Sequence, residues 1–78
     1  MTGLDCFLGV DGGGTKTRFA LVNGEGRVLA QAQHGTTYHP QVGFEAVREI
    51  LAAGVRQVLQ EAGLPGAAIR YAFFGLPA

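Results

Sequence analysis

The chain has 78 residues with six basic and six acidic side chains, so its formal net charge is zero. Without a basic stripe this balance argues against nucleic-acid binding, and no segment approaches the ~20 apolar residues of a membrane span. A single cysteine excludes an internal disulfide, and the absence of a secretory signal makes the cytoplasm the expected location.

Apolar and alternating segments in the first half predict three strands. Residues 6–10 (CFLGV) form an apolar run typical of a strand covered on both faces. Residues 17–22 (TRFALV) alternate with period two, and residues 23–26 (NGEG) predict a hairpin turn before a third strand over residues 27–33 (RVLAQAQ). The side chains expected to share one face of the second strand are Thr17, Phe19 and Leu21.

The second half predicts a loop, one helix and a fourth strand. Glycine and proline in residues 34–40 indicate the loop. Residues 44–62 have helical spacing, Gly63 is expected to end the helix, and Pro65 prevents its continuation. Residues 69–74 (IRYAFF) predict the last strand. The expected apolar helix positions are Phe44, Val47, Leu51, Val55, Val58 and Ala62, flanked by Ile50 and Leu59.

Several side chains carry packing expectations. Gly54 lies in the middle of the helix, where glycine costs up to about 1 kcal/mol, so it is expected to permit close packing against the sheet. Cys6 is expected to be an inert, buried small hydrophobe. The aromatic side chains Tyr71, Phe73 and Phe74 are expected in the core rather than on a base-stacking platform.

The resulting order of strand, strand, strand, helix, strand predicts an α/β fold with a mixed sheet. The first three strands form an antiparallel meander, and the helix crosses over to a strand parallel to the first. One helix leaves one face of a four-stranded sheet bare. Residues 1–78 are therefore expected to be the N-terminal part of a longer protein.

The stretch 11-DGGGTKT-17 is the segment most suggestive of chemistry. It lacks the last glycine of the dinucleotide fingerprint, and Thr15 stands where the Walker A loop needs glycine. A strand follows the stretch, whereas both motifs open a helix. A plain hairpin turn needs only one or two glycines for positive φ. Three glycines, which have no side chains, instead leave the backbone N–H groups uncovered, so that an anion could approach them. With the hydroxyls of Thr15 and Thr17 and the charge of Lys16, the stretch favours a phosphate loop over a plain turn.

The stretch 8-LGVDGGGTKTRFALVNGEGRVLAQA-32 resembles the first phosphate motif of the actin, sugar-kinase and heat-shock chaperone ATPase superfamily. Within it, DGGGTKT resembles the BadF-type ATPases and the N-acetylglucosamine kinases, and the ending 73-FFGLPA-78 is also similar to these families. The resemblance implies a ribonuclease-H-like, actin-like ATPase domain that begins strand, hairpin, strand, helix, strand.

The resemblance also implies site residues. Asp11 would hold Mg²⁺ through water, and the loop would bind the phosphates of ATP. The expected ATP-binding residues are Gly12, Gly13, Gly14, Thr15, Lys16 and Thr17. The loop after the third strand would form part of the substrate site, with Thr36, Thr37, Tyr38 and His39 as the candidate residues. Tyr38 stands where relatives commonly have asparagine, and the general base would be an aspartate beyond this chain.

The expected function is ATP-dependent phosphotransfer to a sugar or amino sugar, similar to an N-acetylglucosamine kinase. One alternative is a BadF-type ATPase that couples hydrolysis to activation of another enzyme, and another is a non-catalytic nucleotide-binding module. The expected partner is the small-molecule sugar, with no nucleic acid and no membrane, and a homodimer is compatible with the sequence. His34 and His39 are expected to be structural or exposed, and no zinc-type spacing occurs.

Overall fold

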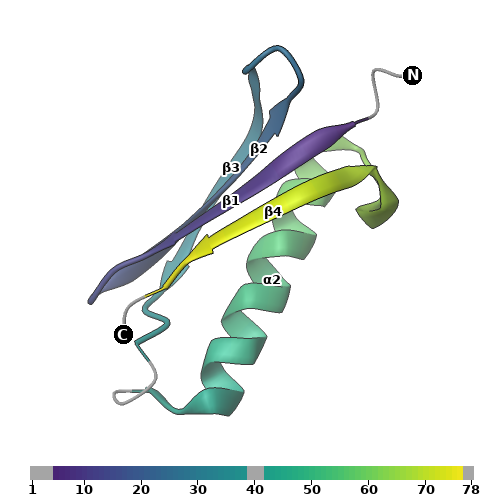
Figure 1. The fold of residues 1–78 in the computed structure, drawn as a ribbon. Helices are drawn as coiled ribbons and strands as arrows, with labels where there is room; N and C mark the ends of the chain where they lie inside the picture. Colours follow the sequence, from purple (N-terminus) through teal and green to yellow (C-terminus); the bar gives the residue numbers. More distant parts are fainter. Residues whose placement is uncertain (1–4, 39–41, 77–78) are drawn as a thin grey trace.

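The computed structural model describes residues 5–38 and 42–76, which form one sheet and one long helix (Figure 1). The elements in chain order are β1 (Cys6–Gly12), β2 (Lys16–Asn23), β3 (Val28–Gly35), α2 (Phe44–Ala62), the short 3-10 helix η1 (Gly66–Ala68) and β4 (Ile69–Gly75). Among these residues, no helix is long and apolar enough to cross a membrane.

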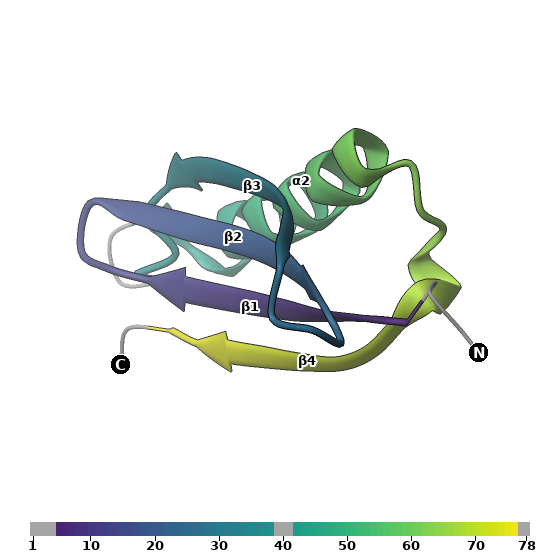
Figure 2. The same ribbon diagram turned by 90° about the horizontal axis from the view of Figure 1, so that it is seen from above.

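The sheet has the strand order β3-β2-β1-β4. β1 and β2 are antiparallel, β2 and β3 are antiparallel, and β4 runs parallel to β1 after the crossover through α2. Figures 1 and 2 show α2 lying across a single face of this sheet. The predicted mixed sheet, its meander and its parallel crossover are therefore confirmed.

The core lies between α2 and the sheet face that it covers. Strand alternation places Thr17, Phe19 and Leu21 on that face, where each is at most 1% exposed. Val58 supplies the most buried helix side chain. The complete set of buried apolar residues is Cys6, Leu8, Val10, Phe19, Leu21, Ala30, Val58 and Ala68.

Gly54 allows α2 to approach β2 closely. A Cβ built on Gly54 would overlap the ring of Phe19. That ring is 1% exposed and lies edge-on to the His34 ring, with centroids 5.6 Å apart. The expected close packing is confirmed, and it explains why the helix retains a glycine despite its low helix propensity.

The helix begins and ends at the predicted residues, but the first of its predicted apolar positions is exposed. The predicted range 44–62 is confirmed, and Gly63 adopts a left-handed conformation with φ 71°. The N–H groups of Gly63 and Leu64 bond the carbonyls of Gln60 and Leu59. Phe44, however, is 74% exposed.

The sheet face opposite α2 carries exposed aromatic side chains. Phe7 and Tyr71 stack with their ring centroids 5.9 Å apart and nearly parallel planes. Tyr71 and Phe73 are 68% and 74% exposed, and Phe74, on the helix side, is 45% exposed. The expectation that these three β4 aromatics lie in the core is wrong for the described residues, because Tyr71 and Phe73 are on the face that α2 leaves uncovered and Phe74 is only partly covered by α2. The expected bare sheet face is confirmed.

Candidate functional site

The glycine loop forms the turn between β1 and β2. Asp11 and Gly12 end β1, Lys16 begins β2, and the intervening residues 13–15 make the turn. The Gly13 N–H donates to the Lys16 carbonyl at 2.8 Å, which closes the turn. Gly14, Thr15 and Lys16 are exposed, so this end of the hairpin is open to solvent.

Neither Gly13 nor Gly14 has the positive φ for which a tight turn usually requires glycine. The glycines with positive φ among the described residues are Gly26, Gly43 and Gly63. A Cβ built on Gly14 would meet nothing within 4 Å, and one on Gly13 would make only an ordinary contact at 3.5 Å. Positive φ is therefore not the reason for Gly13 or Gly14, and neither is packing within the described residues.

A threonine from the loop after β3 is tied to the glycine loop. The Thr36 hydroxyl donates to the Gly13 carbonyl at 2.8 Å and accepts from the Tyr38 N–H at 3.0 Å. Thr36 is 7% exposed. The structure thus brings together the two candidate segments that the sequence separates, since the phosphate loop and the proposed substrate loop are in direct contact.

A second pair of threonines joins the same two segments. The Thr17 hydroxyl donates to the Thr37 hydroxyl at 3.2 Å, and both residues are at most 2% exposed. Both hydroxyls therefore face protein, on the side of the sheet that α2 covers. The side chains of Thr17, Thr36 and Thr37 therefore link the two loops within the protein, and their predicted contacts with ATP or substrate stay predictions.

Asp11 lies at the end of β1 with an exposed side chain. Its partner across the hairpin is Arg18, directly opposite in the β1–β2 register. No group of three or more His, Cys, Asp or Glu that could hold a metal occurs in residues 5–38 and 42–76. A single exposed carboxylate fits a Mg²⁺ ion that keeps most of its waters and arrives with a phosphate ligand, rather than a dedicated protein cage.

Arg18 is a charged neighbour of the site that sequence reasoning missed. It shares the uncovered sheet face with Asp11 and, by alternation, with Lys16. The signal was present in the sequence, because counting outward from the centre of the hairpin loop pairs residue 11 with residue 18. Two cations beside the glycine loop favour an anionic ligand there.

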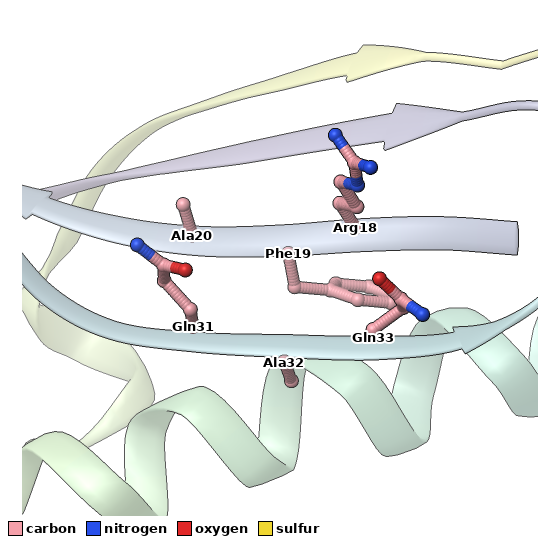
Figure 3. A pocket seen from close by; sticks show the side chains of 6 residues that line it. All are labelled: Arg18, Phe19, Ala20, Gln31, Ala32 and Gln33. Atoms are coloured by element: carbon pink, nitrogen blue, oxygen red, sulfur yellow. The ribbon is translucent and has the colours of Figure 1, made fainter.

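A depression over β2 and β3 shares Arg18 with the surroundings of the glycine loop but includes no residue of the loop itself. Figure 3 shows its lining residues, with Arg18 and Ala20 on β2 and the two glutamines on β3. Phe19 and Ala32 form its floor and point toward α2. The depression contains no carboxylate or nucleophile, so its chemistry points to no reaction.

The remaining candidates have structural roles where the structure describes them. His34 Nε2 lies 2.8 Å from Gln57 Oε1, which ties β3 to α2. Cys6 is fully buried, and burial, followed by the charge of Asp5, raises the pKa of its thiol. A protonated, buried thiol is inert, as expected. His39 lies outside the described residues.

The comparison with protein-family models decides the affiliation of this fold and loop. Residues 8–77 match the model of the BadF/BadG/BcrA/BcrD ATPase family, which covers both the glycine loop and the crossover helix. The chain belongs to this ATPase family. The description of this family names ATPases.

A solved structure shares the fold of this family member. It is described as a "putative N-acetylglucosamine kinase" from Chromobacterium violaceum. The two chains are 30% identical with a TM-score of 0.67, and the match covers 95% of this chain and 27% of that chain. The present chain thus spans about a quarter of the length of that protein. The comparison with curated protein sequences returned no match.

Proposed function

We propose that this chain supplies the phosphate-binding part of an ATP-dependent kinase that phosphorylates a sugar or amino sugar. The observation that carries the proposal is the open space at Gly14, where neither backbone conformation nor packing within the described residues calls for glycine. A phosphate chain lying against bare backbone would account for it. Family membership supports ATP as its source, and the similar Chromobacterium violaceum protein supports a sugar as acceptor.

The residues around the loop have complementary chemistry for phosphoryl transfer. The exposed Gly14 and Thr15 would donate backbone N–H groups to phosphate oxygens, and the exposed Lys16 would add a positive charge. Asp11 would hold a water of the magnesium ion. That ion, when bound, would neutralise charge on the phosphates during transfer. The chain's own part is to position the phosphates, and the base that activates the acceptor hydroxyl is expected outside it.

The test is a valine scan of the two hairpin turns in the full-length protein. Gly14→Val should weaken ATP binding by roughly tenfold or more, because its side chain would occupy the space that the phosphates need. Gly24→Val is the matched control, since Gly24 is also exposed, has no positive φ and has nothing within 4 Å of a built Cβ. Calorimetric titration with ATP and circular dichroism would be recorded for both. Unchanged ATP affinity in a folded Gly14→Val protein would leave the loop a plain turn.

A second function is favoured by the family description, which names ATPases. In that case the same loop would bind ATP for hydrolysis coupled to the activation of another protein. Assays of ATP consumption with and without N-acetylglucosamine distinguish the two. A kinase forms one sugar phosphate for each ATP consumed, whereas an activating ATPase releases inorganic phosphate irrespective of the sugar.

A further inference from the structure

The Thr36 hydroxyl donates the hydrogen bond that the Gly13 carbonyl would accept from a backbone N–H in an ordinary hairpin turn. In many β-turns the first carbonyl accepts from the N–H three residues later. Here the turn is closed by the hydrogen bond from the Gly13 N–H to the Lys16 carbonyl, and the Gly13 carbonyl accepts from the Thr36 hydroxyl at 2.8 Å instead. A side chain 23 positions away in sequence therefore determines which way this carbonyl points.

The orientation of that carbonyl also determines the orientation of the next N–H. The Gly13 carbonyl and the Gly14 N–H belong to one peptide unit, and no cis peptide bond occurs among the described residues. In a planar trans peptide these two groups point in opposite directions. Because the carbonyl points toward the 7% exposed Thr36, the Gly14 N–H points away from it, toward the open side of the loop.

The Gly14 N–H has no hydrogen-bond partner within the part of the chain that the structure describes. Gly14 is exposed, and a Cβ built on it would meet nothing within 4 Å. A donor held in a fixed direction and free of internal bonds is preorganised for an anion. The hydroxyl that holds it is itself fixed, since it also accepts from the Tyr38 N–H.

We infer that Thr36 is a positioning residue for phosphate binding, which acts through the Gly13–Gly14 peptide without touching the ligand. This role replaces the direct sugar contact expected for Thr36, because both the donor and an acceptor position of its hydroxyl are used within the protein. The inference rests on the proposed function, since the ligand of the Gly14 N–H would be a phosphate oxygen of ATP.

The role predicts a specific pattern among three variants of the full-length protein. Thr36→Val keeps the shape but loses the hydroxyl, so the Gly13–Gly14 peptide can rotate, and the affinity for a β,γ-imido analogue of ATP should fall by roughly ten- to a hundredfold. Thr36→Ser keeps the hydroxyl and should restore most of the affinity. Affinity for AMP, which lacks the outer phosphates, should change little in either variant.

Asn23→Ala provides the control for a general loss of stability. The Asn23 side chain also accepts backbone N–H groups, those of Glu25 and Arg27, both at 2.9 Å. It lies at the opposite end of β2, roughly 25 Å from the glycine loop. Thermal unfolding should show a loss of stability in Asn23→Ala as in Thr36→Val, whereas nucleotide affinity should fall only in Thr36→Val.

Amide resonances of the wild-type protein give a direct measurement that needs no variant. Titration with the imido analogue should shift the Gly14 N–H resonance downfield, while the Gly24 N–H should not respond. If wild-type protein binds the analogue and shifts the Gly14 resonance but Thr36→Val binds it equally well, the positioning role is overturned and the proposed function survives. Binding that leaves the Gly14 resonance unchanged overturns the positioning role and the phosphate contact at Gly14. A wild-type protein that does not bind the analogue overturns both.

Discussion

At the scale of single residues, the hydrogen bonds, open space and charges around the glycine loop distinguish it from a plain turn more than its backbone conformation does. Gly13 contributes its N–H to the turn and its carbonyl to Thr36. Gly14 is exposed with open space around it. On the uncovered sheet face, Asp11 and Arg18 stand opposite one another across the hairpin. The loop therefore combines bare backbone, one carboxylate and nearby cations within a few residues.

Replacement of Asp11 tests its predicted contact with magnesium. In the full-length protein, Asp11→Asn keeps the size of the side chain and removes its charge. ATP affinity should change little, because the nucleotide brings its own chelating oxygens for the metal. Turnover should fall by about 10²–10³-fold, since the position of the ion matters most as charge develops during transfer. Steady-state kinetics over a magnesium series would measure both effects.

Glu25→Gln is the matched control for that experiment. Glu25 is an exposed acid in the other hairpin turn, so its amide variant should retain wild-type turnover. Asp11→Asn with near wild-type turnover at limiting magnesium would show that Asp11 does not position the metal.

At the scale of secondary structure, the contact between Gly54 and Phe19 sets how closely α2 approaches the sheet. α2 begins without a side-chain cap, since Gly43 precedes it, and it buries only Gly54 and Val58 completely. Because so few of its residues are buried, the packing of α2 on the sheet depends strongly on each of them. The Phe19 ring cannot move aside easily, because it is 1% exposed and packs edge-on against His34.

Gly54→Ala is expected to destabilise the protein although alanine is the better helix former. The propensity gain is about 1 kcal/mol, whereas forcing a methyl group into a filled core typically costs 1–3 kcal/mol, so the expected net loss is up to about 2 kcal/mol. Urea unfolding of the full-length protein would measure it. Phe19→Leu in the same chain should relieve the overlap, so that Gly54→Ala becomes neutral or stabilising in that background. A stabilising Gly54→Ala in the wild-type background would contradict the close contact.

At the scale of the whole molecule, one sheet face remains open in the described chain. Phe7 on β1 and Tyr71 and Phe73 on β4 lie together on it, while β2 separates them from the polar side chains of β3. Exposed aromatic groups of this size on one surface are unusual for an isolated domain. That further chain covers this face stays a prediction.

The 78-residue chain by itself is therefore predicted to expose apolar surface. It should bind a fluorescent dye specific for such surface and self-associate in analytical ultracentrifugation. Tyr71→Thr and Phe73→Thr, which keep good strand formers, should reduce both effects. Gln31→Thr, on the polar part of the same face, should change neither. A soluble monomer that melts cooperatively and binds no dye would show that the chain needs no further cover.

The sequence by itself determined the order of the elements, the limits of the helix and the pairing within the first hairpin. These features depend on local periodicity and on glycine and proline at the turns, which act within a few residues. The helix range 44–62 and its end at Gly63 were therefore predictable to the residue. Even the opposition of Asp11 and Arg18 follows from counting outward from the turn.

Only the tertiary structure decided which distant residues meet. The Thr36–Gly13 and Thr17–Thr37 hydrogen bonds join positions 23 and 20 residues apart, and the overlap of Gly54 with Phe19 depends on where the helix lies on the sheet. The exposure of Tyr71 and Phe73 likewise reflects what covers β4, not the apolar character of β4 itself. A sequence pattern states which side chains prefer burial, but burial and hydrogen-bond direction depend on packing between elements, which only the folded chain specifies.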